Sequence, residues 1–123
     1  MWLSVSIYKD WKLAKHHIAA ALENAGDTHS TDDVFDMIIE GKASLFVGKK
    51  SAVVTQELDL PIGKQLHFWL AGGDLNELIE IEKDVEQAAR KRGIRRISII
   101  GRRGWRKKLQ GFHEAGVILT KDI

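Results

Sequence analysis

The sequence predicts an α/β protein whose mixed sheet has helices on both faces. Near the C-terminus a strand, a helix and a second strand follow one another over residues 64–101, and such a unit makes a parallel, right-handed crossover. Upstream, two apolar runs at 43–58 are split only by the residues GKK, which predicts an antiparallel hairpin. The expected order is β-α-α-β-β-β-α-β-α-β, within a single domain that spans 1–123.

Length and composition agree with one globular domain. The chain has 123 residues, and 44% of them are hydrophobic, which is enough for a buried core. There is no cysteine, so disulfides and thiolate chemistry are excluded. No apolar run approaches the ~20 residues of a membrane span, and the N-terminus lacks the pattern of a signal peptide. We therefore expect no membrane partner.

The first half of the chain predicts one strand, two helices and the hairpin. Residues 2–7 have high β propensity and partial alternation. Residues 9–26 place one apolar stripe on a helix that ends at Gly26. Ser30 and the acids after it favour the start of a second helix over 30–41. The stripe of the first helix consists of Trp11, Ala14, Ile18, Ala21 and Leu22.

The second half predicts the central sheet and its crossover. After a loop at 59–63, the strand at 64–73 directs Leu66, Phe68 and Leu70 to one face and His67, Trp69 and Ala71 to the other. Asp74 begins a helix over 74–93 with the apolar stripe Leu75, Leu78, Ile81, Val85 and Ala88. A strand at 94–101 follows, then a helix over 102–116 that presents Trp105, Leu109 and Phe112, and a last strand at 117–120.

Charge is distributed unevenly along this half. Six acids and one lysine occupy 74–86, whereas 90–108 contains ten of the nineteen Lys and Arg and no acid. One interpretation is the solvated side of a helix whose other side is core. The other is a surface for nucleic acid or an acidic partner. Its expected contacts are Arg95, Arg96, Arg102, Arg103, Arg106 and Lys107.

Three stretches resemble the GNAT superfamily of N-acetyltransferases. They are DDVFDMIIEGKASLFV, LHFWLAGGDLNELIEIEKDVEQAARKRGIRRISIIGRRGW and LQGFHEAGVILTKDI, and together they cover most of the chain. The nearest look-alikes are small GNAT-like proteins of tailed phages and prophages. The resemblance implies a GNAT-like fold in which acyl-CoA lies between two splayed parallel strands.

The resemblance also implies a cofactor loop, at LAGGDLNE (70–77). Family enzymes hold the pyrophosphate on backbone N–H groups there, as anions bind at a helix N-terminus. The cofactor-binding residues would be Ala71, Gly72, Gly73, Asp74, Leu75 and Arg102. However, the loop has no Gln or Arg and lacks the family glycine spacing, and Asp74 places a carboxylate where phosphates should lie. The alternative is a strand-to-helix turn with Asp74 as its N-cap.

The catalytic groups implied by the resemblance are incomplete. Family enzymes often carry a general-acid tyrosine four residues before the closing glycine, Gly116 here, and that position is Phe112. By position, His67 and Glu57 are the candidate bases, although a lone strand histidine is also explained by packing. No His, Asp or Glu cluster has metal-ligand spacing, so no metal is expected.

Three functional hypotheses follow. The first is a GNAT-like phage or prophage protein with a degenerate acyl-CoA loop. It would be a non-catalytic virion or assembly component that contacts other particle proteins or itself, and it would require no cofactor. The second is an acetyl-CoA-dependent N-acetyltransferase. The third is a nucleic-acid-binding module that uses the basic block at 90–108. The expected location is the bacterial cytoplasm or the virion.

Overall fold

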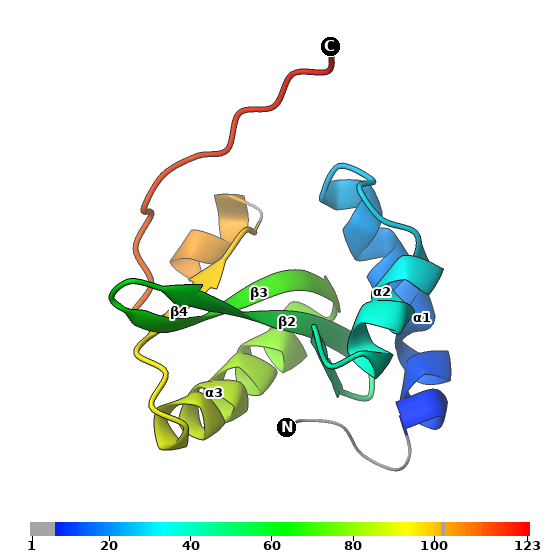
Figure 1. Ribbon diagram of the computed structural model, residues 1–123, viewed down its shortest axis with the longest axis horizontal. Coiled ribbons are helices and arrows are strands. Elements are labelled where there is room, and N and C mark those ends of the chain that lie inside the picture. Colours follow the sequence, from blue (N-terminus) through cyan, green and yellow to red (C-terminus); the bar gives the residue numbers. More distant parts are fainter. Residues whose placement is uncertain (1–6, 102) are drawn as a thin grey trace.

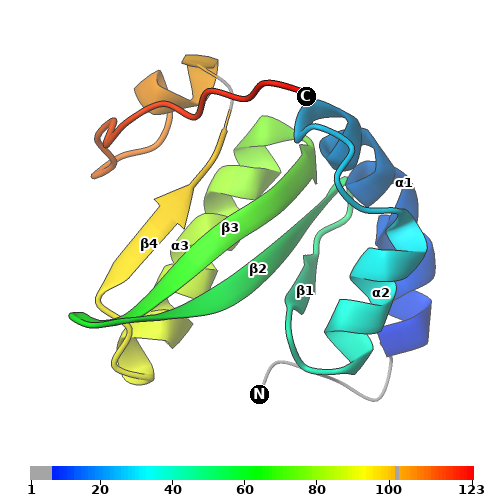
Figure 2. The same cartoon turned by 45° about the horizontal axis from the view of Figure 1, so that its top comes forward.

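A four-stranded mixed sheet separates two helices on one face from one helix on the other (Figures 1 and 2). The structure is a computed structural model that describes residues 7–101 and 103–123, with the backbone alone at 103 and 106. The strand order is β1-β2-β3-β4. This confirms the predicted α/β class with helices on both faces. The predicted strand at 2–7 lies outside the described residues except for Ile7, which begins the first helix.

Helices α1 (Ile7–Asn24) and α2 (Thr31–Ile39) cover the first face of the sheet. The predicted stripe of α1 is buried in full, from Trp11 to Leu22. Ser30 caps α2 through a capping box: its hydroxyl accepts from the Asp33 N–H, and the Asp33 carboxylate accepts from the Ser30 N–H. Both helices form where the sequence predicts them because their caps and apolar stripes agree.

Strands β1 (Ser44–Val47), β2 (Ser51–Leu60) and β3 (Gly63–Gly73) form an antiparallel meander. The expected loop at 59–63 is shorter than predicted, because Leu60 pairs with Gly63 and only Pro61 and Ile62 make the turn. Strand β4 (Arg96–Ile99) runs parallel to β3. The predicted crossover is thereby confirmed.

A β-bulge at Trp69 reverses the alternation of β3. Thr55 of β2 pairs with Phe68 and Val54 pairs with Leu70, so Trp69 is the extra residue. Leu66 and Phe68 therefore pack on the α3 face, while Leu70 packs with the α1–α2 face. The predicted common face for these three residues is wrong at Leu70, because one additional residue exchanges the two faces of a strand.

Helix α3 (Leu75–Lys91) packs on the second face of the sheet. Its buried positions are Leu78, Glu82, Val85 and Ala89, and Ile81 is half-buried beside them. The stripe is rotated slightly from the prediction, since Ala89 replaces Ala88 as the buried alanine. A carboxylic acid, Glu82, occupies a core position.

The last two predicted elements do not form. Instead of a helix over 102–116 there is one short 3-10 helix, η1 (Arg103–Lys107), and 117–120 is not a strand. Gly104 and Gly111 weaken a helix here, and Gly111 has φ +81°, which a right-handed helix excludes. The run of cations adds like-charge repulsion within each turn. These local effects explain why the helix predicted from the spacing of Trp105, Leu109 and Phe112 does not form.

Candidate functional site

Strands β3 and β4 stop pairing at the bulge. Their parallel pairs run from Gln65–Arg96 to Phe68–Ile99. Beyond Phe68, β3 continues to Gly73 beside β2, while β4 ends at Ile99. The resemblance places acyl-CoA at this point, between the last part of β3 and the end of β4. The predicted cofactor residues 71–75, which are consecutive in the chain, lie at this point, whereas Arg102 lies outside the described residues. Cofactor binding by them stays a prediction.

The glycine pair at the end of β3 serves close backbone packing. A side chain at Gly72 would collide with the carbonyl oxygen of His17 in α1. A side chain at Gly73, whose φ is +113°, would collide with the carbonyl oxygen of Lys50 in the β1–β2 turn. The Asp74 N–H donates to that same oxygen at 3.1 Å. The two glycines thus join β3 to α1 and to the hairpin turn.

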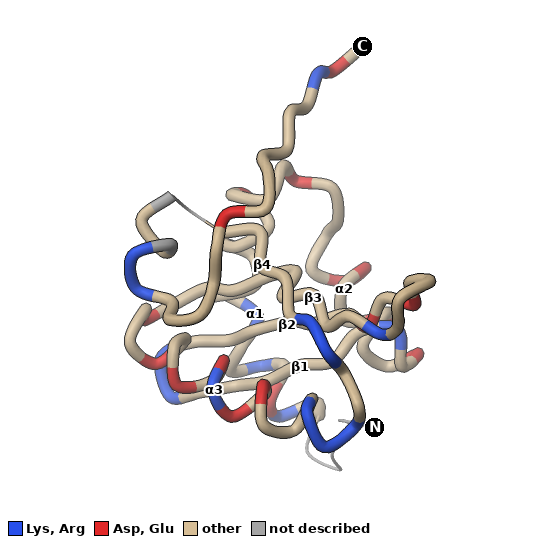
Figure 3. The backbone as a smooth tube through the Cα atoms, turned by 90° about the vertical axis from the view of Figure 1, so that its left-hand side faces the viewer, with Lys and Arg blue, Asp and Glu red and all other residues tan. Residues whose placement is uncertain are grey.

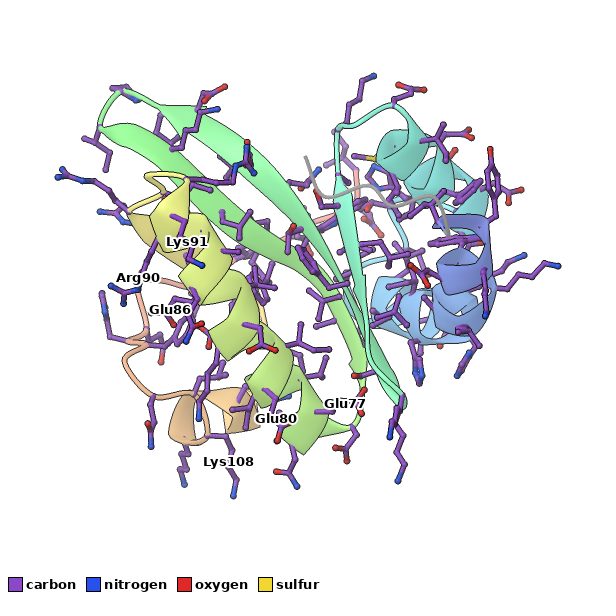
Figure 4. The ribbon with its side chains drawn as sticks, turned by 90° about the horizontal axis from the view of Figure 1, so that it is seen from below. Glu77, Glu80, Glu86, Arg90, Lys91 and Lys108 are labelled. Carbon is purple, nitrogen blue, oxygen red and sulfur yellow. The ribbon has the colours of Figure 1, made fainter. Side chains whose placement is uncertain are left out.

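Two carboxylates occupy the first turn of α3. Asp74 is the N-cap, and its Oδ2 accepts from the Glu77 N–H at 3.0 Å. The Glu77 carboxylate accepts from the Ser51 hydroxyl and, at 2.9 Å, from the Lys50 N–H. These bonds, with that from Ser51 first, lower the pKa of Glu77, so it is ionised at neutral pH. Figure 4 shows Glu77 at the start of α3, beside the sheet.

The α3 side of β4 has two hollows. An open hollow of about 1860 Å³ runs along α3 and β4 to the C-terminal segment. A second hollow, of about 20 Å³, lies between α3 and the ends of β3 and β4 and has room for about one water molecule. The indole of Trp105 and the side chain of Leu109 close it from the η1 side. Its other walls are Val53, Phe68, Ala71, Leu75, Leu78, Ile79, Glu82 and Ile99. The cofactor candidates Ala71 and Leu75 are therefore half-buried residues that line this hollow.

The two candidate bases lie on opposite faces of the sheet. Glu57 pairs with Leu66 and so lies on the α3 face, where it forms ion pairs with Arg92 and, at 3.7 Å, with Lys64. These contacts tie the β2–β3 hairpin to the end of α3. His67 lies on the other face, and its Nδ1 is 2.8 Å from the Ser98 hydroxyl. One proton acceptor cannot assist the other across the sheet.

Burial lowers the pKa of His67, and its hydrogen bond to Ser98 opposes that effect only in part. The imidazole is therefore neutral at pH 7. A neutral, half-buried imidazole next to the unpaired part of β3 is able to accept a proton. Phe112, which the resemblance places at the general-acid position, does not belong to a helix, because residues 112–123 have no regular structure. The comparison of Phe112 with the family tyrosine assumes a helix that ends at Gly116, and that helix does not form.

Glu82 is the ionisable residue that the sequence interpretation missed. Its side chain is buried on α3 and lines the small hollow. Burial, followed by a hydrogen bond to Glu86, raises its pKa to about 7. The signal in the sequence is its spacing: Glu82 lies four residues after Leu78, three before Val85 and seven before Ala89, on the apolar stripe. An acid in a stripe is uncommon unless it is paired or functional.

The basic residues do not share one helix face. Arg95 and Arg96 are exposed at the start of β4, whereas Lys107 is exposed in η1, beyond the end of β4. Figure 3 shows cations at separate places on the backbone, with acids along α3 between them. Arg102 and the side chains of Arg103 and Arg106 lie outside the described part of the structure. Nucleic-acid contact by this block stays a prediction.

Among the residues that the structure describes, no helix is long and apolar enough to cross a membrane. Nor do three or more His, Asp or Glu side chains of the described residues gather where a metal ion could be held.

The fold is shared with solved bacterial proteins. The BH1408 protein of Bacillus halodurans, in a tetramutant form, is 13% identical with a TM-score of 0.63 over 96% of this chain and 94% of that one. A predicted acetyltransferase of Clostridium acetobutylicum, crystallised with acetyl-CoA, is 13% identical with a TM-score of 0.61 over 95% and 90%.

The TTHA1254 protein of Thermus thermophilus is 14% identical with a TM-score of 0.54 over 85% of this chain and 89% of that one. No family model and no curated protein sequence matches the chain. At such low identities these likenesses concern the fold alone, and they support the GNAT-like fold that the sequence predicts.

Proposed function

We propose that this protein is a GNAT-like domain that has lost acetyl transfer and acts through protein contacts, as a component of a phage or prophage particle or of its assembly. The observation that carries the proposal is the pair of carboxylates, Asp74 and Glu77, in the first turn of α3. The phage setting is supported by the sequence resemblance to small phage proteins.

Electrostatics explains why this pair matters. A helix N-terminus attracts phosphate because its N–H groups are unpaired and its dipole is positive there. The Asp74 carboxylate accepts a hydrogen bond from one of these groups, the Glu77 N–H, and adds a negative charge. A unit charge on a phosphate ~5 Å from that carboxylate would be repelled by between about 1 and 3 kcal/mol, depending on the local dielectric. The loop therefore disfavours the ligand that it would have to hold.

Calorimetric titration with acetyl-CoA tests the proposal. We expect no saturable binding by the wild-type protein at millimolar ligand. Asp74→Ser keeps an N-cap hydroxyl and removes the charge, so it is the matched variant for the charge alone. Measurable binding of acetyl-CoA by Asp74→Ser would show that the Asp74 carboxylate prevents binding in the wild-type protein. Micromolar binding by the wild-type protein would overturn the proposal.

Acetyl transfer is the second candidate, and two observations favour it. Strands β3 and β4 cease to pair at the position where the family binds acyl-CoA, and the fold is shared with a protein crystallised with acetyl-CoA. In that case His67 would take the proton of the acceptor amine. The test is acetylation of a panel of amines and peptides by the wild-type protein and by His67→Gln. Turnover that depends on His67 would favour this candidate over the first.

A further inference from the structure

Strand β4 leaves one edge of the sheet open. Its neighbour on one side is β3, and no described residue forms a strand on its other side. Ile97 and Ile99 of β4 are half-buried against the α3 face, and Ile100 is 58% exposed. An open edge presents unpaired N–H and C=O groups, which template the addition of another strand.

The C-terminal segment carries an apolar run that the described structure leaves outside the core. Val117 is 74% exposed, Ile118 64% and Leu119 89%. The segment has no regular structure. Val117 and Ile118 border an open hollow beside β4, and the end of the chain runs away from the body of the protein (Figure 1). Three consecutive apolar residues, two of them β-branched, have the composition of a strand, yet they pair with no described strand.

We propose that residues 117–120 of one copy pair antiparallel with β4 of a second copy, and that the exchange is reciprocal. The four residues of the segment match the four residues of β4. A two-fold exchange covers both open edges and both apolar runs at once, and it closes the assembly as a dimer. This pairing is independent of whether the domain binds acyl-CoA.

Side-chain chemistry fixes the register. If Thr120 lies opposite Arg96, then Leu119 lies opposite Ile97 and Val117 opposite Ile99. Directly opposite residues share one face of a sheet, so Val117 and Leu119 would reach the α3 face and Ile118 would lie on the opposite face. The open hollow on this face is lined in part by Ile94, Ile97 and Ile99, and also by Val117 and Ile118 of the same chain.

Charge does not decide the direction of the segment. With Thr120 opposite Arg96, Lys121 lies opposite Arg95 and Asp122 opposite Ile94, so a like-charge pair accompanies the acid. The antiparallel direction is favoured because antiparallel pairing is slightly more stable per residue than parallel pairing. A shift by one residue would turn Val117 and Leu119 away from the apolar face.

Cross-linking between two different chains tests the exchange, because the chain has no cysteine. Arg96→Cys and a tagged Thr120→Cys would be co-expressed and treated with a short bismaleimide. We expect a covalent dimer that contains one chain of each kind. Leu13→Cys, at a residue 57% exposed on α1, replaces Arg96→Cys in the control and should give no product with Thr120→Cys. Each variant treated alone reports any cross-link between like chains.

Light scattering and a charged substitution complete the test. We expect the wild-type protein to have twice the mass of one chain. Leu119→Asp should raise the dissociation constant of the dimer by about tenfold or more, because it buries an unpaired charge. Its helical circular dichroism signal should not change, since Leu119 lies outside the helices. A wild-type monomer, or cross-links that form only within an Arg96→Cys/Thr120→Cys double variant, would overturn the proposal.

Discussion

The two faces of the sheet are closed to different degrees. On the face covered by α1 and α2, Ile18, Val34 and Ile38 are fully buried. On the α3 face, Ile97, Ile99 and Trp105 are only half-buried, and the carboxyl group of Glu82 lies among apolar side chains. Figure 2 shows α1 and α2 along the first face and α3 along the second.

This difference suggests that the α1–α2 face mainly stabilises the fold, whereas the α3 face near β4 is available for interactions. A close-packed apolar cluster contributes most of the free energy of folding and tolerates little change. The incompletely covered face, with an open strand edge and a buried acid, can gain contacts without first losing any. The candidate acyl-CoA position and the proposed exchange site both lie at β4 or at the end of β3. We therefore expect mutations on the first face to change stability and those near β4 to change association or binding.

The largest expected effect compares one substitution on the two faces. Ile18→Ala, at a fully buried position, should lower the free energy of unfolding by about 4 kcal/mol. Ile81→Ala, at a half-buried position on α3, removes the same atoms and should cost about 1–2 kcal/mol. Urea denaturation followed by circular dichroism measures both. Equal losses would contradict the unequal closure of the two faces.

The pH dependence of stability should depend on Glu82. Because folding raises its pKa from 4.5 to about 7, the native state binds more protons than the unfolded state between these values. The stability that Glu82 contributes is complete below pH 4.5 and is lost as the pH rises through 7. Glu82→Gln stays neutral, so it should exceed the wild-type protein by about 3 kcal/mol at pH 8 and match it at pH 4.

The matched control for this pH series is Glu80→Gln, because Glu80 lies on the same helix with its side chain directed outward (Figure 4). Urea denaturation at pH 4, 6 and 8 would separate the two variants. If Glu80→Gln and Glu82→Gln had the same pH profile, burial of Glu82 would not be the cause.

The sequence predicts the fold well where local signals agree. The capping residue Ser30, the apolar stripe of α1, the short GKK turn and the β3-α3-β4 crossover are each specified by more than one feature, and each is confirmed. The bulge at Trp69 was not predictable, since an extra residue in a strand leaves alternation intact within the sequence and changes only the pairing. The last helix was predicted from apolar spacing alone, while its glycines and cations opposed it.

The candidate site was predictable in part. The position of the glycine turn and the cap at Asp74 follow from the residues. That Gly72 and Gly73 contact α1 and the hairpin turn depends on segments distant in the sequence, so no local pattern reveals it. Glu57 and His67 lie on neighbouring strands, β2 and β3. The register of these strands, which the sequence does not reveal, places the two side chains on opposite faces of the sheet.

The smallest expected effect compares two substitutions at one helix cap. Asp74→Ala removes the acceptor for the Glu77 N–H and should lower the free energy of unfolding by about 1 kcal/mol. Asp74→Ser retains a capping oxygen, so its free energy of unfolding should lie within about 0.5 kcal/mol of the wild-type value. Ser30→Ala removes the corresponding hydrogen bond at the start of α2. Its loss of stability should resemble that of Asp74→Ala, and it serves as a reference from the face covered by α1 and α2. A large loss with Asp74→Ser would mean that the negative charge itself stabilises the start of α3, and the acetyl-CoA titration of that variant would then report on folding as well as on binding.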